Sequence, residues 1–188
     1  SVFYDKEVVP KSYILEVSRL STFVASLREF TLDEMMRLWN QYSIQSMSAM
    51  FKSLAMDLGN VKKFLDLYSI DPDEVLTYPW TLEPVQRLFA DEEFKNLMEA
   101  HIADKRDRLL EYCAGKDLVV ESDEDIAIVD IGWRGTIQDN LCYLFRNTMI
   151  YGYYVGLIQF LNKQPENSCK YGYLDKCSFA RALLTIST

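Results

Sequence analysis

Cysteine and histidine are scarce in this chain, and their scarcity argues against several kinds of active site. The 188 residues include four cysteines and one histidine, His101. No two cysteines form a C-x-x-C pair, so we expect no zinc site. The serines lack the histidine and aspartate partners of a hydrolase triad. Reduced thiols in a cytoplasmic protein are the simplest interpretation of the cysteines.

Long apolar runs and an excess of basic residues are also missing. No apolar stretch has the length of a transmembrane helix, and no signal peptide is evident, so we expect a cytoplasmic protein without a membrane span. Lysine and arginine total 20 against 28 acidic residues, a formal net charge of -8. This balance argues against a nucleic-acid partner, because phosphate neutralisation requires clustered basic residues, but it allows a local cationic pocket. Both chain ends look cut, so we expect a fragment whose partners include other domains of the same polypeptide.

What the sequence does contain is a long helical region flanked by apolar segments. Tyr13–Val17 (YILEV) is a strand candidate, and Ile126–Ile131 and Ile150–Ile158 are two more. Residues 20–115 carry apolar side chains at three- and four-residue steps, which is typical of amphipathic helices. We therefore predict one α/β domain over residues 1–188. It has a Rossmann-like parallel sheet with a large helical insertion between the first and second strands, and residues 20–115 form a helical cap subdomain.

The stretch IAIVDIGWRGTIQ, from Ile126 to Gln138, has the pattern of a binding site. An apolar strand ends in Asp130, and a turn that contains two glycines leads into a segment with helical periodicity. This order places free backbone N–H groups and a helix N-terminus at one point, where anions bind.

Ligands of an open parallel sheet bind outside the carboxyl ends of its strands, and two arginines are expected there. Arg19 follows the first predicted strand, so we expect Arg19, Arg134, Asp130 and Thr136 to converge on one cleft. Such a set suits a phosphate or diphosphate. Asp130 is the candidate catalytic residue, as a base, or it holds Mg²⁺ or a sugar hydroxyl. The candidate binding residues are Ser18, Arg19, Gly132, Trp133, Arg134, Gly135, Thr136 and Gln138.

Each of these residues also has a purely structural interpretation. Thr136 and Asp139 fit a helix-capping pair, and the two glycines permit a tight turn. Trp133 fits a hydrophobic plug, and Asp130 fits a cap of the following turn. The pattern is not a Walker A motif, because no Gly-Lys-[Ser/Thr] is present. It is not the dinucleotide fingerprint either, because the third glycine is missing.

Two short motifs carry a resemblance to a known family. VDIGWRGT, at Val129–Thr136, and YILEVSR, at Tyr13–Arg19, resemble a conserved region of large predicted HAD-superfamily proteins from bacterial surface-polysaccharide loci. In those proteins the region follows the phosphatase domain, and many also carry glycosyltransferase domains. The resemblance implies a cytoplasmic role in making capsule or O-antigen-type glycans, but it implies no known reaction for this region.

We therefore expect a phosphosugar- or nucleotide-sugar-binding domain of a multidomain bacterial surface-polysaccharide biosynthesis protein. The sequence leaves open whether it is an enzyme, either a transferase or part of a HAD-type hydrolase polypeptide, and Mg²⁺ is the one cofactor that it suggests. One alternative is a non-catalytic scaffold that links phosphatase and glycosyltransferase modules. Another is a phosphoribosyltransferase-like enzyme, although the usual paired acidic residues before its diphosphate loop are reduced here to Asp130.

Overall fold

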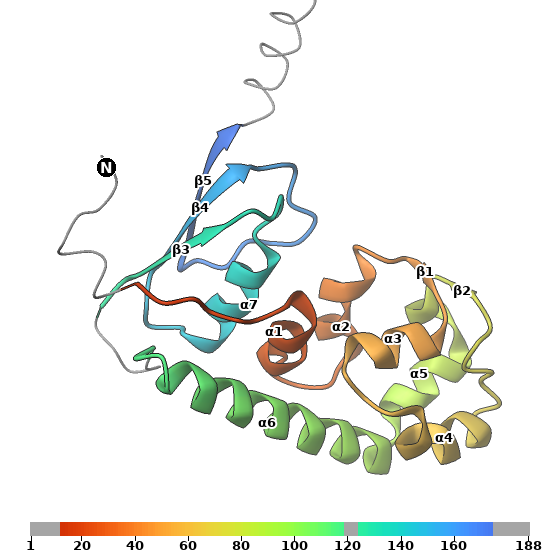
Figure 1. The fold of residues 1–188 in the computed structure, drawn as a ribbon. Helices are drawn as coiled ribbons and strands as arrows, with labels where there is room; N and C mark the ends of the chain where they lie inside the picture. The colour runs from red at the N-terminus through yellow and green to blue at the C-terminus, as the bar shows by residue number, and fades with distance from the viewer. Residues whose placement is uncertain (1–11, 119–123, 175–188) are drawn as a thin grey trace, which may run out of the picture.

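The computed structural model describes residues 12–118 and 124–174, which form a helical region followed by a sheet region (Figure 1). The helical region holds six helices and a two-stranded antiparallel pair, and the sheet region holds three parallel strands and one helix. The helices are α1 (Arg19–Ser26), α2 (Leu32–Trp39), α3 (Met47–Ser53), α4 (Leu58–Leu67), α5 (Glu83–Ala90), α6 (Glu92–Ala114) and α7 (Thr136–Leu144), with a 3₁₀ turn η2 (Pro79–Thr81). The strands are β1 (Ile44–Gln45), β2 (Leu76–Thr77), β3 (Ile126–Asp130), β4 (Ile150–Gly156) and β5 (Ser168–Leu174).

Helix starts in the helical region follow local capping chemistry. Thr31 accepts a hydrogen bond from the Glu34 backbone N–H at the start of α2, and Asp91 accepts one from Phe94 at the start of α6. The prediction that residues 20–115 are mostly helical is confirmed.

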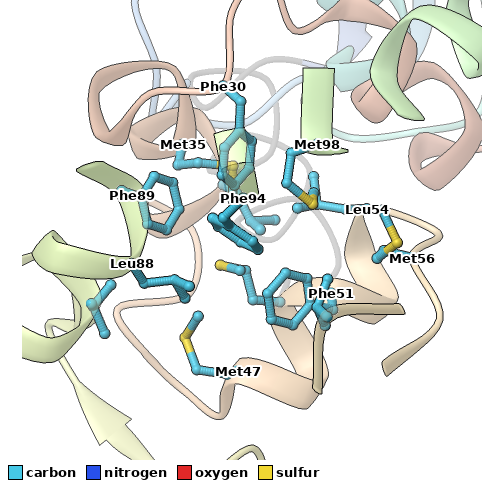
Figure 2. Packing of buried hydrophobic residues seen from close by; sticks show 14 of the residues in the cluster. Phe30, Met35, Met47, Phe51, Leu54, Met56, Leu88, Phe89, Phe94 and Met98 are labelled. Atoms are coloured by element: carbon cyan, nitrogen blue, oxygen red, sulfur yellow. The ribbon is translucent and has the colours of Figure 1, made fainter. Parts of the chain in front are cut away.

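The core of the helical region is built around aromatic and methionine side chains (Figure 2). Phe94, on α6, is fully buried at its centre. Its ring lies 5.2 Å from that of Phe64 and 5.4 Å from that of Phe30, both in edge-on arrangements that aromatic pairs prefer. The same helix continues into the sheet region, where Leu109 and Cys113 join the core beneath α7. Helix α6 therefore connects the two cores.

The sheet region has strand order β3-β4-β5, with all neighbours parallel. Helix α7 connects β3 to β4 and packs on one face of the sheet, where it also contacts α1 (Figure 1). The opposite face is exposed: Val129 on β3 is 86% accessible and Tyr173 on β5 is 85% accessible. The rings of Tyr153 and Tyr171 stack on this face at 5.3 Å. The predicted mixed α/β architecture with a parallel sheet is confirmed, but one face of that sheet is bare in the described part of the chain.

The prediction that residues 13–17 form the first strand of this sheet is wrong. They run as an irregular segment along the end of α6, where the Glu16 backbone N–H donates to the Tyr112 hydroxyl at 2.8 Å. Leu15 and Val17 pack against the core of the sheet region. The alternating apolar side chains are therefore partly buried, although the segment pairs with no strand in the described part of the chain. Among the described residues, the helical region therefore precedes the sheet and is not inserted between two of its strands.

Among residues 12–118 and 124–174, no helix combines the length and apolar character that crossing a bilayer requires.

Candidate anion-binding site

The turn between β3 and α7 has the geometry that its two glycines suggest. Asp130 Oδ1 accepts a hydrogen bond from the Gly132 backbone N–H at 3.0 Å, which closes a tight turn after the strand. Gly135 has φ of +63°, in the left-handed region that favours glycine. A Cβ atom at Gly135 would lie 2.7 Å from both Lys170 Cε and Tyr154 Oη, so the position also lacks space for a side chain.

Helix α7 begins without a side-chain cap. The capping residue is Gly135 and not Thr136, which is the first residue of the helix, so the interpretation of Thr136 as the cap is wrong. Gly135 has no side chain that accepts hydrogen bonds from the first turn, unlike the residues that cap α1, α2 and α6. The first turn of α7 therefore presents N–H groups and the positive end of the helix dipole.

A cleft opens at this end of α7, between the two regions of the molecule. It contains about 430 Å³ of space that protein atoms do not fill, part of it open to solvent. Three walls surround it: helices α1 and α2, the start of α7 with its preceding turn, and the loop between β4 and β5. Its lining residues are Phe23, Arg37, Gln41, Arg134, Thr136, Asp139, Asn140, Tyr143, Phe160, Leu161, Asn162, Lys163 and Gln164.

Arg37 forms the α2 side of the cleft and is held by a polar network. Its guanidinium donates to Ser26 Oγ at 2.7 Å and to Asn140 Oδ1 at 2.9 Å, and it pairs with Glu34 at 3.3 Å. The guanidinium also lies 4.0 Å from the centre of the Tyr143 ring. These contacts fix Arg37 between α1, α2 and α7, so it contributes positive charge in a defined position.

Lys170, on β5, lies beneath the cleft and joins its walls. Its side chain is 4% exposed and forms an ion pair with Asp139 Oδ1 at 2.6 Å. The ammonium group also donates to Gln164 Oε1 at 2.6 Å and to the Arg134 carbonyl at 3.2 Å. Burial raises the pKa of Asp139 and lowers the pKa of Lys170, and their mutual attraction opposes both shifts. The pair ties α7 and the β4–β5 loop to β5.

Arg134 and Lys163 are the cations of the cleft whose charge is least neutralised. Arg134 Nε is buried, and among the described residues it has no hydrogen-bond partner. Lys163 is exposed on the β4–β5 loop. A buried donor without a partner is costly, so the described part of the chain leaves the hydrogen-bonding capacity of Arg134 unfilled at the edge of the cleft.

Four residues were expected to converge on one cleft. Of these, Arg134 and Thr136 line it, whereas Arg19 and Asp130 do not. Arg19 is exposed at the start of α1, with its guanidinium 5.4 Å from the centre of the Tyr42 ring, and it does not line the cleft. Ser18 caps α1 by accepting a hydrogen bond from the Ser21 backbone N–H at 3.1 Å. The prediction placed Ser18 and Arg19 at the carboxyl edge of the sheet because it made residues 13–17 a strand. Since residues 13–17 are not a strand, Ser18 and Arg19 lie elsewhere.

Asp130 and Trp133 also lie outside the lining of the cleft. Asp130 is occupied by the turn, as described above. Trp133 is 50% exposed, and its ring packs against the backbone of Gly156 at the end of β4. Among the described residues, no group of three or more His, Cys, Asp or Glu side chains is placed to hold a metal ion.

Gln138 is buried and serves the sheet. Its amide nitrogen lies 2.7 Å from the Ile150 carbonyl and 3.0 Å from the Cys169 carbonyl, and its amide oxygen accepts from the Tyr154 hydroxyl at 2.7 Å. Because these contacts occupy the side chain, the structure gives Gln138 a role in joining α7 to β4 and β5 and leaves none of it facing the cleft.

The sequence analysis overlooked three cationic residues at the cleft: Arg37, Lys163 and Lys170. Arg37 has the appearance of a surface residue on an amphipathic helix. Lys170 carried a usable signal, because alternation along Ser168–Leu174 places it on the same face as Gly172 and opposite the exposed tyrosines. A lysine on the face of a strand that a helix covers requires a buried partner.

One further stretch, residues 71–75 (DPDEV), has the letters of the aspartate motif of HAD phosphatases, D-x-D-x-T/V. It forms a turn that precedes β2, in which the Asp73 backbone N–H donates to Asp71 Oδ1 at 2.9 Å. Strand β2 pairs with β1 in the helical region. The stretch therefore lies in the helical region and not at the carboxyl edge of the parallel sheet.

In comparisons with known proteins, no family model matches the chain and no curated protein matches it.

Proposed function

We propose that the cleft binds the phosphate group of a phosphorylated sugar or nucleotide-sugar, within a cytoplasmic multidomain protein of bacterial surface-polysaccharide synthesis. The observation that carries the proposal is Arg134, whose buried Nε lacks a partner at the mouth of an uncapped helix. An anion seated there accepts hydrogen bonds from the guanidinium and from the first turn of α7.

Charge supports an anionic ligand. The whole chain is acidic, but three cations line the cleft against one carboxylate, and that carboxylate is paired with Lys170 beneath it. The helix dipole adds roughly 0.3–1 kcal/mol for an exposed anion and up to ~2 kcal/mol for a partly buried one. A local positive field in an acidic protein favours a small anion over a nucleic acid, which requires an extended basic surface.

Position supports the same ligand class. The cleft lies where β3 gives way to α7 and where β4 leads into its loop, which is the carboxyl edge of the parallel strands. Rossmann-like sheets bind phosphate-containing ligands at that edge, and we propose this mode of binding here.

The test is the Arg134→Ala variant. We expect its affinity for glucose 1-phosphate and UDP-glucose, measured by calorimetric titration, to fall at least tenfold, because a charge-assisted hydrogen bond is lost. The melting temperature is expected to change little. Arg146→Ala is the matched control: Arg146 is exposed beyond the far end of α7, so its removal leaves affinity unchanged. A wild-type chain that binds neither compound contradicts the proposal.

A second function, the scaffold that links phosphatase and glycosyltransferase modules, is favoured by the exposed sheet face. Parallel sheets are covered on both faces in nearly all proteins, and the Val129 face is bare in the described part of the chain. If a neighbouring module covers this face, substitution of Val129 lowers the stability of the proposed multidomain polypeptide. The same substitution leaves the stability of this chain alone nearly unchanged. The phosphoribosyltransferase-like alternative gains no comparable support, because Asp130 is occupied by its own turn.

A further inference from the structure

The cleft contains a carboxylate, that of Asp139. A site that binds only inorganic phosphate would not be expected to contain one. Asp139 lies in the first turn of α7 and lines the cleft, with its side chain 16% exposed. An ionised carboxylate is only an acceptor of hydrogen bonds, so it repels phosphate oxygens and accepts from hydroxyl groups.

We infer that the ligand of this cleft is a phosphorylated polyhydroxy compound of sugar-phosphate type, and that Asp139 determines this specificity by accepting a hydrogen bond from a hydroxyl. This role of Asp139 rests on the proposed function, in which cations bind the phosphate group, and it adds a partner for the hydroxylated body of the ligand. Arg134 and Lys163 take the phosphate group, and Asp139 takes the hydroxylated body.

Asp139 is fixed in position by a partner that does not itself line the cleft. Lys170 lies behind the carboxylate, and its ammonium group is also bound to Gln164 Oε1 and the Arg134 carbonyl. The pair is therefore neutral as a whole, with Asp139 in the lining of the cleft and Lys170 behind it on β5, and a hydrogen bond from Gln164 also holds the Asp139 carboxylate. A carboxylate held in this way keeps its orientation in the absence of ligand, which lowers the entropic cost of binding.

The other walls suit the body of a sugar. Gln41 and Thr136 supply polar side chains, and Phe160 supplies a partly exposed ring on the loop wall. Sugars present hydroxyl groups at their edges and C–H groups on their faces, so a wall that combines polar side chains with an aromatic ring matches both.

The experiment compares ligands of equal charge. Calorimetric titrations of the full chain use methyl phosphate, which has no hydroxyl-bearing body, and glucose 1-phosphate and glucose 6-phosphate. We expect wild type to bind at least one glucose phosphate roughly tenfold or more tightly than methyl phosphate, which is the effect of one hydrogen bond to a charged group.

The decisive variant removes the neutral pair together, as Asp139→Leu/Lys170→Met. Replacement of a buried ion pair by apolar residues of similar volume is commonly tolerated by the fold, whereas removal of one partner leaves an unpaired charge. The ratio of glucose phosphate affinity to methyl phosphate affinity is expected to fall to about one, because the hydroxyl acceptor is lost while the net charge of the cleft is unchanged. Arg134→Ala, in contrast, lowers both affinities by the same factor.

The outcomes separate the inference from the proposed function. A wild-type chain that binds none of these phosphates overturns both. Equal affinity of wild type for methyl and glucose phosphates overturns the inference alone, as does a double variant that keeps the preference. If the double variant fails to fold, Asp139→Asn provides the test: it is expected to bind methyl phosphate more tightly and to lose the preference, and an unchanged preference overturns the inference.

Discussion

The helical region and the sheet region bury their apolar side chains in different ways. The helical region closes on itself around Phe94, with side chains from α1 to α6 filling one apolar core (Figure 2). The sheet region covers one face of its sheet and leaves the other exposed. Its covered face is secured by polar side chains, among them Gln138 and Lys170, as much as by apolar packing. Stability is thus expected to reside mainly in the helical region, and ligand chemistry at the boundary where the polar groups gather.

The largest effect is expected for Phe94→Ala. Removal of a fully buried ring at the centre of the helical core costs about 3–5 kcal/mol of unfolding free energy, because the lost burial and the new cavity add together. Urea denaturation followed by circular dichroism measures the change. A cost below about 1 kcal/mol would show that the core of this region is not the main source of stability.

A smaller effect, dependent on pH, is expected for Glu34 at the boundary of the two regions. Glu34 pairs with Arg28 at 2.8 Å and with Arg37 at 3.3 Å. Burial alone raises the pKa of Glu34, but hydrogen bonds from Arg28 and the charge of Arg37 outweigh it, so the pKa lies below its usual 4.5. A lowered pKa in the folded state means that the carboxylate stabilises the fold above pH 4.5, and this contribution is lost as the pH falls through the folded-state pKa.

Glu34→Gln is therefore expected to cost about 1–3 kcal/mol at pH 7 and to flatten the acid side of the stability profile. Urea midpoints measured between pH 7 and pH 3 test both parts. Glu29→Gln is the control, because Glu29 is an exposed neighbour, and it is expected to leave the profile unchanged. Parallel profiles for wild type and Glu34→Gln would contradict the assignment.

The smallest effect is expected for Val129→Ser on the exposed sheet face. Surface substitutions change stability by less than about 0.5 kcal/mol, and Val129 is 86% accessible. Thermal melts of this chain alone measure the effect. The same substitution in the multidomain polypeptide that we propose then distinguishes the two proposed functions, since a loss of stability confined to that setting supports the scaffold. A large loss in the isolated chain would show that the face is already covered.

The sequence predicted the parts of this fold that depend on neighbouring residues. Helix periodicity is a local signal, and the mostly helical content that it predicts for residues 20–115 is confirmed. The strands at Ile126 and Ile150 are also confirmed, since their apolar runs are read within a few residues. Residues 13–17 have the same kind of alternation, but a strand needs a partner, and the Tyr112 hydroxyl on α6 takes the place of one.

The site was predicted in part for the same reason. Arg134 and Thr136 belong to one contiguous motif, and both line the cleft. Arg37 comes from a helix about a hundred residues earlier in the chain, and Lys170 comes from a strand that follows. The contribution of Arg37 depends on how α2 packs against α7, which no local pattern encodes. For Lys170, alternation along β5 indicates burial, but the partner Asp139 depends on how β5 packs against α7.

The contact between Gln138 and Gly152 has a consequence for how this protein varies in evolution. A Cβ atom on Gly152 would lie 1.8 Å from Gln138 Oε1 and 2.5 Å from Tyr154 Cε2, so residue 152 has no room for a side chain while Gln138 and Tyr154 keep these positions. Homologues that keep glutamine at 138 are expected to keep glycine at 152. Those that gain a side chain at 152 are expected to carry a shorter residue at 138, and then to lose the amide that binds the Ile150 and Cys169 carbonyls. These two positions should therefore change together.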